Sequence, residues 1–473
     1  MICSYNFFLF MICVTQFLCI LFLLKTKTDQ FDEIFEVLQS HYLLDGLNLL
    51  RYGKSVNKTQ PQIFNMSSSV FCFGELMKDR ECRFQNLCYR KDTSEYIFLH
   101  GAETRLYGLE HARNDPALVD LSSVVNHTAK YFTYTKIHSP SLNFVDLEYV
   151  TGPSVLFHRF NPENLMHVLH DDLIPLYHTQ RKHFPTSKDD VTYIIMDGRP
   201  DGPFYDLYKM LLPRIKLKKH FNKTLTCFED VIVGVSKTTT WYHYGFRTPQ
   251  GPINRTFFPS TEISYFRNDF KLKIGSGNIP APEQLSKYIV LFSRSLTRKI
   301  VNEVKFMMKL SKHYKAPVHV VNLETDPLSH IVSLVSHAHM VIGVHGAHLI
   351  TSLFMQPSSI LIEIFPFGVP AVNYTPYKTL ANLVRMTYIA WENKNEKNTV
   401  THEDWSSDYG GITTFSNTIQ DDIINTKVVP LHICCKNPYW LFRIYQDTIV
   451  DVDDFINAVD SKVDGKNRNE SPL

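Results

Sequence analysis

Short apolar runs alternate with helix-length segments through the second half of the chain. The runs are rich in Val and Ile and have the length of buried strands, and the segments between them have the length of helices. In chain order, the expected elements span residues 287–293, 301–314, 318–323, 327–337, 340–345, 349–355 and 360–365. This alternation predicts a parallel βαβ sheet with helices on its faces.

The first half of the chain shows the same alternation less densely. Its expected strands are 154–157, 191–196 and 231–235, each an apolar run of strand length. Its expected helices are 164–183, which carries an amphipathic leucine stripe, and 203–212. The first half is therefore expected to be a second α/β unit.

A segment rich in glycine and proline, 275–282, separates the two halves and predicts a hinge. A final helix at 440–446 is expected to cross back to the first half. We therefore expect an α/β protein with two Rossmann-like domains, 71–280 and 281–459, that face a cleft. A polar tail follows at 460–473.

An apolar run near the N-terminus has the composition of a membrane span. Residues 7–24 are nearly all apolar, and about 18 such residues is the lower limit for crossing a bilayer. With a short tail at 1–6 and a stem at 25–70, the run predicts a transmembrane signal anchor. Lys25 and Lys27 on its C-terminal side would favour placing the rest of the chain in the cytosol. A cleaved signal peptide stays open as an alternative.

Cysteines and sequons indicate a body on the luminal side. Six cysteines follow the apolar N-terminal run, and an oxidising compartment would let them pair. We expect 72–88 to be a disulfide-pinned entry to the fold. Cys434 and Cys435 should take separate partners, with Cys227 or a cysteine of 72–88 as one of them. Asn-X-Ser/Thr sequons, the pattern for N-glycosylation, start at Asn57, Asn65, Asn126, Asn222, Asn254, Asn373 and Asn469, and Pro376 weakens the sixth.

Composition excludes one class of partner. The chain has 473 residues, with 49 Lys and Arg against 47 Asp and Glu, for a net charge of +2. This balance provides no basic field for nucleic acid. The length is sufficient for two or three domains with large cores.

Polar residues follow the ends of the expected strands in the second half. Arg294 and Arg298 come after the first strand, and His345, Gly346 and Ala347 come at the end of the third. Open α/β sheets bind ligands at the carboxyl ends of their strands. A guanidinium can pair two oxygens of a diphosphate at once. The sequence therefore predicts a nucleotide-diphosphate site here.

One acid, Glu363, lies inside the apolar strand 360–365. A strand-end carboxylate suits ribose hydroxyls, and an unpaired buried charge would be costly. Asn302 and Glu303 follow the two arginines and are candidates for an acceptor-side or supporting role. The simpler alternatives are a surface salt bridge for the arginines and a backbone-satisfied ring for His345.

One expected helix carries a candidate general base. Asn164, His167 and Asp171 share a face, because spacings of three and four residues place side chains about one turn apart. A carboxylate beside an imidazole suits a base that takes a proton from an attacking hydroxyl. His170 and Asp172 flank the site and could take the role instead. The simpler alternative is a His–Asp pair that only stabilises the helix.

Together these motifs resemble one inverting glycosyltransferase family, which also holds plant xylan-decorating enzymes and the EGF-domain-specific O-GlcNAc transferase. The motifs are Asn164-x2-His167-x3-Asp171, Ser293-Arg294-x3-Arg298-x3-Asn302-Glu303, Gly343-Val344-His345-Gly346-Ala347 and Glu363. Longer blocks are similar to the branch that acts on O-linked mannose. They span 159–173, 239–246, 249–252, 374–381 and 437–448. The resemblance covers roughly residues 70–460.

The resemblance implies a GT-B fold in a single-pass type II protein of the endoplasmic reticulum membrane, with a luminal catalytic body. It implies transfer of GlcNAc from UDP-GlcNAc, with inversion and in β-1,4 linkage, to O-linked mannose on glycoproteins such as α-dystroglycan. No cofactor or metal is expected beyond the donor substrate, since cationic side chains would neutralise the diphosphate.

The resemblance also implies residue roles. Asp171, oriented by His167, would be the base, with Asp172 as the other candidate. Among the motif residues of the second half, Arg294 and Arg298 would hold the diphosphate, Glu363 the ribose, and His345 with Gly346 and Ala347 the nucleotide end. Asn164 and Arg159 would be acceptor-side or supporting residues.

Three other functions stay open at this point. One is an O-GlcNAc transferase of the EGF-domain type, and another is a lectin-like module without turnover. The third is a luminal metal-dependent hydrolase with His167, His170 and Asp171 as ligands. Two departures from the family are visible. Residues 348–351 read His-Leu-Ile-Thr where the family usually has Gly-Leu-Thr-Asn. No run of short strands matches the C-terminal fibronectin type III domain of that branch, so how an acceptor peptide would be recognised stays open.

Overall fold

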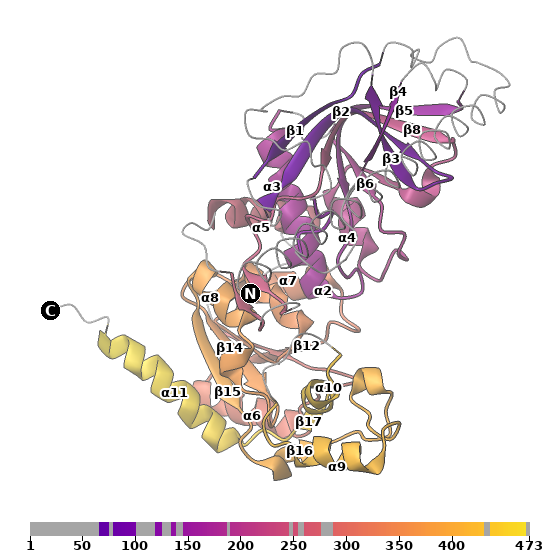
Figure 1. Cartoon of the computed structure of the whole chain (residues 1–473). Helices are drawn as coiled ribbons and strands as arrows, with labels where there is room; N and C mark the ends of the chain where they lie inside the picture. Colours follow the sequence, from indigo (N-terminus) through magenta and orange to yellow (C-terminus); the bar gives the residue numbers. More distant parts are fainter. Residues whose placement is uncertain are drawn as a thin grey trace, which may run out of the picture.

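The computed structural model shows a mixed α/β molecule with two parts, each built on its own sheet (Figure 1). The description covers residues 66–74, 79–100, 119–124, 134–138, 145–186, 190–245, 249–253, 260–275, 287–429 and 436–469. The expected signal anchor, Cys434 and Cys435 lie outside these residues. Within them, no helix is long and apolar enough to cross a membrane.

The first part is built on a mixed sheet of order β4-β3-β2-β8-β5-β6-β7, with β1 paired to β2. Its strands are β1 Ser69–Phe73, β2 Glu81–Arg90, β3 Glu95–His100, β4 Tyr134–His138, β5 Leu147–Phe157, β6 Thr192–Ile195, β7 Arg214–Leu217 and β8 Leu225–Val233. The strands expected from the sequence are β5, β6 and β8, which are parallel neighbours. However, β2 is antiparallel to β1, β3 and β8, so the sheet of this half is mixed and differs from the parallel sheet of a Rossmann-like domain. A short turn at 91–94 joins β2 to β3, and such hairpin connections produce antiparallel pairs.

Two disulfides fasten this sheet. Cys72 pairs with Cys82 and joins β1 to β2, and Cys88 pairs with Cys227 and joins β2 to β8. The prediction of a disulfide-pinned entry at 72–88 is confirmed by the first of these. Cys227 is joined to Cys88, so the expectation that it is a partner of Cys434 or Cys435 was wrong.

Helices of the first part lie on the side of its sheet that faces the second part. A continuous helical stretch comprises α2 Leu165–His167, the π-helical segment η5 Val168–Leu173 and α3 Ile174–His183. The remaining elements are α4 Tyr205–Leu211, the 3-10 turn η6 Lys218–His220, the hairpin strands β9 Tyr242–His243 and β10 Gly251–Pro252, and α5 Ser260–Lys273. The helices expected at 164–183 and 203–212 are confirmed.

The second part is built on a five-stranded parallel sheet of order β12-β11-β13-β14-β15. The elements are β11 Ile289–Phe292, α6 Glu303–Tyr314, β12 Val318–Val321, α7 Leu328–His337, β13 Met340–Val344, η8 Ala347–Phe354, β14 Ile360–Phe365, η9 Ala371–Asn373, α8 Pro376–Val384 and β15 Thr387–Glu392. Every strand predicted for this half is present. Because the chain moves outward in opposite directions from β11 and β13, the strand order reverses between them, and a crevice opens at their carboxyl ends.

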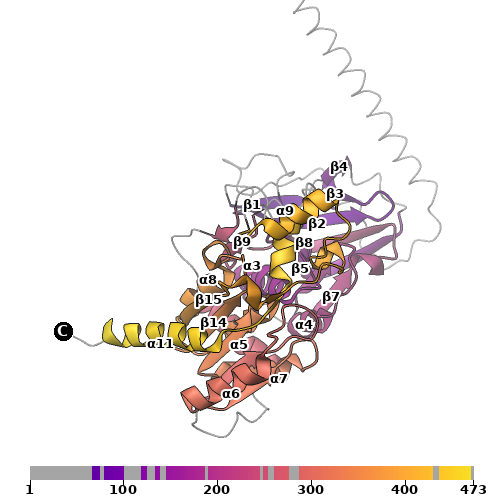
Figure 2. The same ribbon diagram turned by 90° about the horizontal axis from the view of Figure 1, so that it is seen from below.

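The C-terminal segment returns along the second sheet. It comprises η10 Glu396–Asn398, β16 Thr399–Val400, η11 Ser407–Tyr409, α9 Asn417–Asn425, α10 Pro438–Ile444, β17 Asp447–Thr448 and α11 Val452–Asn469. α10, which was expected to cross back to the first half, packs against α9 and η11 within the second part. α11 packs on α6 and β15, burying Phe455 and Val459. Figures 1 and 2 both show its C-terminal end projecting from the body.

One hydrophobic core runs through both parts. It joins β5, α3 and α5 of the first part to β11, α7, η8 and α8 of the second. Phe270 of α5 stacks on Phe354 of η8 with ring centroids 4.8 Å apart. The indole N–H of Trp241 donates to the carbonyl of Pro376, at 3.2 Å. The two parts are therefore packed together along their facing helices.

Candidate functional site

Two arginines converge where the strand order of the second sheet reverses. Arg294 and Arg298 follow β11, and Gly346 follows β13. A Cβ at Gly346 would lie 3.1 Å from Nη1 of each arginine, so only glycine leaves room for both guanidiniums. Arg298 has φ of 56°, a left-handed conformation that non-glycine residues seldom adopt and that often marks functional sites. Its Nη1 donates to the carbonyl of His345 at 2.8 Å.

The environment of these guanidiniums is suited to an anion. Burial, with help from Arg298, lowers the pKa of Arg294 to about 10, and burial also lowers the pKa of Arg298. Both stay protonated at neutral pH. Arg294 reaches Glu324 only at 3.8 Å, and Nε of Arg298 is buried with no hydrogen-bond partner among the described residues. Two adjacent half-buried cations, whose carboxylate neighbour among the described residues lies at 3.8 Å, favour a doubly charged ligand.

Asn302 and Glu303 support the loop that carries the arginines. The side-chain amide of Asn302 bonds both backbone groups of Val450, at 2.8 and 2.9 Å. Glu303 accepts the hydroxyl of Ser293 at 3.0 Å. Both residues therefore fix the base of the loop, and no hydrogen bond or ion pair among the described residues joins them to the guanidiniums.

Glu363 is placed behind His345. It is fully buried on β14, and Oε1 lies 2.5 Å from Nδ1 of His345 while Oε2 accepts the hydroxyl of Tyr388 at 2.5 Å. Each oxygen already has one hydrogen-bond partner, and the expected ribose contact of Glu363 stays a prediction. The carboxylate fixes the orientation of the His345 ring.

The second cluster lies on the π-helical segment of the first part. Asn164 caps α2, the turn that precedes this segment, by accepting the N–H of Met166 at 3.0 Å. Asp171 then lies 2.7 Å from Nδ1 of His167 and 2.5 Å from Nδ1 of His170, and it accepts the hydroxyl of Tyr244 at 2.8 Å. Short π-helical segments occur mostly at functional sites, because they shift side chains out of the regular helical register.

Hydrogen bonding fixes the protons of this cluster. The backbone N–H of Trp241 donates to Nε2 of His170 at 3.0 Å. The proton of His170 is therefore on Nδ1 and is donated to Asp171. Burial opposes ionisation of Asp171, but His170 and His167 hold its pKa below the ordinary value. An ionised carboxylate only accepts, so Nδ1 of His167 also donates, and Nε2 of His167 is free to take a proton.

Exposure separates the members of the cluster. The side chain of His167 is 15% exposed and that of Asp171 is 1% exposed. A general base must come within hydrogen-bond distance of the proton it removes. His167 is therefore better placed than Asp171 to meet an acceptor hydroxyl, and Asp171 is better placed to orient His167.

Asp172 points away from this cluster. It accepts the N–H of Phe160 at 3.0 Å and the hydroxyl of Tyr208 at 2.5 Å, and burial raises its pKa to about 8. Arg159 lies nearby and forms a fully buried pair with Asp197 at 2.9 Å. Both Asp172 and Arg159 are thus tied to neighbouring segments of the first part, which makes them supporting residues.

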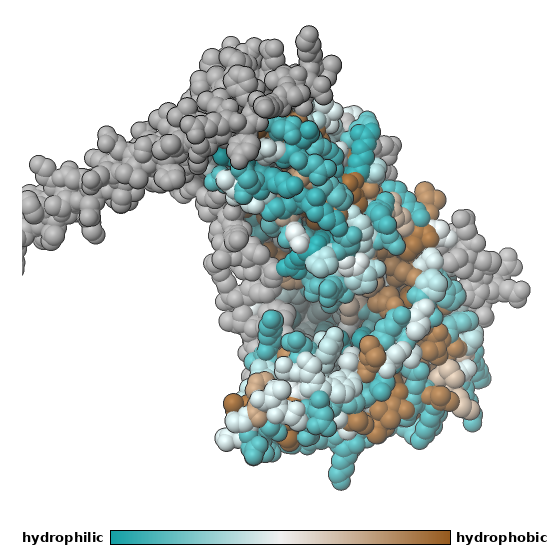
Figure 3. All heavy atoms as spheres, turned by 90° about the vertical axis from the view of Figure 1, so that its right-hand side faces the viewer, coloured by the Kyte–Doolittle hydropathy of each residue, from teal (hydrophilic) through white to brown (hydrophobic). Residues whose placement is uncertain are grey.

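The two clusters lie close together. α2, which ends in His167, packs against η8, which begins beside Gly346. Tyr377 of α8 interacts electrostatically with Tyr244 of the second cluster and with Arg294 of the first. Figure 3 shows a hollow between the two parts on the face of the molecule that it draws. Fold packing therefore brings the arginines and the His167–Asp171 pair to one place.

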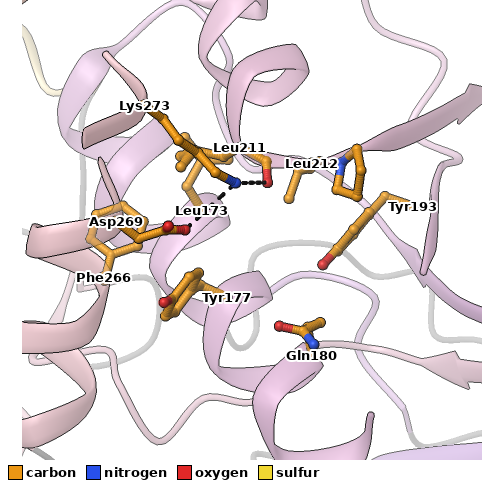
Figure 4. Close-up of a pocket in the computed structure, with 10 residues that line it drawn as sticks. Leu173, Tyr177, Gln180, Tyr193, Leu211, Leu212, Phe266, Asp269 and Lys273 are labelled. Carbon is orange, nitrogen blue, oxygen red and sulfur yellow. Dashed lines mark hydrogen bonds and ion pairs between the residues drawn. The ribbon is translucent and has the colours of Figure 1, made fainter. Parts of the chain in front are cut away.

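A separate pocket lies between α3, α4 and α5 (Figure 4). Lys273 reaches across it to the carbonyl of Leu211 at 3.3 Å and to Asp269 at 3.5 Å. None of its lining residues belongs to either cluster. In the described part of the chain, no group of three His, Cys, Asp or Glu side chains is arranged to hold a metal ion. Both nitrogens of His170 already have partners, which speaks against the metal-ligand trio considered for a hydrolase.

Sequence reasoning missed several residues of these clusters. They are Trp241, Tyr244, His348, Tyr377 and Tyr388. Each is separated from its partner by 25 or more residues along the chain, or interacts with it only electrostatically. Helix or strand spacing in the sequence cannot reveal such contacts. The one available signal was the dense aromatic run at 241–244.

Comparison with known proteins agrees with this geometry. The family model for glycosyltransferase 61 matches residues 161–362, which include the two arginines, His345 and the His167–Asp171 pair. A human protein, "Protein O-linked-mannose beta-1,4-N-acetylglucosaminyltransferase 2", is 41% identical over 406 residues, covering 84% of this chain and 69% of that protein. The proteins of the same name from Takifugu rubripes and Xenopus laevis are each 40% identical, cover 84% of this chain, and are covered over 70% and 69% of their lengths.

Among solved structures, the bacterial iron-containing dodecameric glycosyltransferase TibC matches with 13% sequence identity over 67% of this chain and 77% of that chain. The TM-score of 0.28 is too low to establish a common fold. The sequence relatives carry the assignment. This chain belongs to the glycosyltransferase 61 family and, within it, to the group of protein O-linked-mannose β-1,4-N-acetylglucosaminyltransferase 2 proteins.

Proposed function

We propose that this chain is an inverting glycosyltransferase of the GT-B type. It transfers GlcNAc from UDP-GlcNAc to O-linked mannose on a glycoprotein, in β-1,4 linkage. The observation that carries the proposal is the meeting of a half-buried arginine pair in the second part with the His167–Asp171 pair of the first. The named activity of relatives about 40% identical supports the choice of donor sugar and acceptor.

The donor diphosphate binds at the crevice between β11 and β13. Arg294 and Arg298 contact its oxygens, and the missing side chain at Gly346 lets the two guanidiniums lie close together. As the bond between the sugar and UDP breaks, negative charge grows on the diphosphate, and fixed guanidiniums stabilise that charge. In this proposal the two arginines supply the neutralisation that a metal ion provides in other transferases.

His167 is the general base. Its Nε2 takes the proton of the acceptor hydroxyl, the acceptor oxygen forms a bond to the anomeric carbon, and the bond from that carbon to UDP breaks. Asp171 stabilises the resulting imidazolium and orients the ring through Nδ1. This exchanges the roles that the sequence suggested for His167 and Asp171.

The compartment is the lumen of the endoplasmic reticulum, with the chain anchored by residues 7–24. Two observations support this. Disulfides join Cys72 to Cys82 and Cys88 to Cys227, and such bonds form in oxidising compartments. The sequon at Asn222 lies on an exposed part of the surface where a glycan has room.

The test is transfer from UDP-GlcNAc to an O-mannosyl peptide, read as release of UDP, with UDP affinity measured by calorimetry. Arg298→Ala should weaken UDP binding by about 1.5–3 kcal/mol, the range for a charge-assisted contact. His167→Ala should keep UDP affinity and lower transfer about 10²–10⁴-fold.

Two results would overturn parts of the proposal. Unchanged UDP affinity in Arg298→Ala would remove the donor site from the arginines. Near-normal transfer by His167→Ala, with loss of transfer in Asp171→Asn, would return the role of base to Asp171. Release of UDP without a mannosyl acceptor, at the same rate, would point to a hydrolase.

A further inference from the structure

His348 is a buried residue at the start of η8 that the proposed mechanism does not use. Its ring lies against Phe292, with ring centroids 4.8 Å apart, and the residue is 2% exposed. A Cβ at Gly343 would lie 2.6 Å from its Nε2, and a Cβ at Gly346 would lie 3.4 Å from its Cε1. The ring is therefore held between two glycines and has little freedom to turn.

One nitrogen of this ring meets the donor site. Nδ1 of His348 lies 3.1 Å from Nη1 of Arg294. A guanidinium carries donors only, so Nδ1 must accept, and the proton of the neutral ring is on Nε2. Nε2 is buried with no hydrogen-bond partner in the described part of the chain.

The ring is neutral for a second reason. A protonated ring would place an N–H against the N–H groups of Arg294 and add a third buried cation beside Arg298. Burial, followed by these two guanidiniums, holds the pKa of His348 well below its ordinary value. Burying the N–H on Nε2 without a hydrogen-bond partner is unfavourable, and the fold nevertheless holds the neutral ring in this place.

The other contacts of Arg294 leave Nη1 dependent on this ring. Nε donates to the carbonyl of Thr297 at 2.9 Å, and Nη2 approaches Glu324 only to 3.8 Å. Nη1 is the atom that approaches Gly346 beside Arg298. His348 is therefore the acceptor that fixes the part of Arg294 directed at the proposed diphosphate.

We infer that His348 is a positioning residue for the donor: its neutral ring accepts a hydrogen bond from Arg294 and holds that guanidinium beside Arg298 for the diphosphate. The inference rests on the proposed use of a nucleotide-sugar donor. It makes no claim that His348 contacts the donor itself. An acceptor at the position of Nδ1 is what matters, and the size of the side chain is secondary.

Two variants of the full chain separate these factors. His348→Asn can place its carbonyl oxygen where Nδ1 lies, although it is smaller than histidine. His348→Leu fills the space without an acceptor. Since one hydrogen bond contributes modestly, UDP should bind roughly threefold to tenfold more weakly to His348→Leu and within about twofold of wild type to His348→Asn. If His348 only filled space, the order would be reversed.

Calorimetry with UDP gives the affinities, thermal melting shows that each variant is folded, and Arg294→Ala is the reference variant. If Arg294→Ala weakens UDP binding and the Asn and Leu variants bind equally well, the positioning role is overturned and the donor site stands. If Arg294→Ala binds UDP as wild type does, the donor site itself is overturned. Recovery of affinity in the Asn variant alone supports the inference.

Discussion

At the scale of single residues, adjacent carboxylates have opposite environments. Asp171 is surrounded by donors from His167, His170 and Tyr244, which hold its pKa below the ordinary value against the effect of burial. Asp172 has only two donors, and burial raises its pKa to about 8. One position along the helix thus separates a carboxylate that is ionised throughout the neutral range from one that takes up a proton within it.

This contrast predicts a pH effect on stability. The folded protein binds a proton on Asp172 more tightly than the unfolded chain does, so stability from this group is present below its ordinary pKa of 3.8 and is lost as pH rises through about 8. Asp172→Asn should therefore reduce the fall in unfolding free energy over that interval, and it should keep most transfer activity. Urea denaturation at a series of pH values measures this. An unchanged pH profile would show that Asp172 is already ionised in the fold.

A second residue-scale prediction concerns Glu363. Glu363→Ala should lower the free energy of unfolding by about 1–3 kcal/mol, because it leaves two half-buried donors, on His345 and Tyr388, without their acceptor. Glu363→Gln is the matched control, since its amide can serve both partners. Equal stability of the Ala variant and wild type, by urea denaturation, would show that the two donors find other partners.

At the scale of elements, the contact between β13 and η8 depends on a missing side chain. A Cβ at Gly343 would lie 2.6 Å from His348 and 2.9 Å from Leu349, and both residues are buried. Gly343→Ala should therefore lower stability by about 1–3 kcal/mol, the usual cost of overpacking. Gly251→Ala is the control, because its Cβ would meet nothing closer than 3.7 Å. A Gly343→Ala protein that melts with the control would mean that η8 can move aside at little cost.

The central strands of the second part were predictable because they are uniformly buried. Strands such as β13 and β14 are buried on both faces, and each appears in the sequence as an unbroken apolar run. In the first part, β2 mixes buried and exposed positions and carries Cys, Arg and Gln, so no run reveals it. The arginine pair was predictable because it follows a strand end, whereas the carboxylate partners of His167 and His345 could be located but not assigned roles without knowing their burial.

At the scale of the whole molecule, the two disulfides should contribute unequally. Cys88–Cys227 closes a separation of 139 residues and Cys72–Cys82 one of 10. On the chain-entropy model, removing the first costs about 5 kcal/mol and removing the second about 3 kcal/mol. The double variants Cys88→Ala/Cys227→Ala and Cys72→Ala/Cys82→Ala, compared by denaturation, measure the difference. The reverse order would show that strain or packing outweighs chain entropy.

The shared core has a consequence for how the two parts respond to a ligand. Because Phe270 stacks on Phe354 and one apolar cluster includes β5 and β11, opening of the first sheet exposes surface of the second. Binding of a nucleotide to the second part should therefore also stabilise the first part. Amide exchange in β5, which is remote from that ligand, should become slower. The donor and acceptor sites would then be coupled through the stability of the shared core, and a ligand bound at one site would reduce local unfolding at the other.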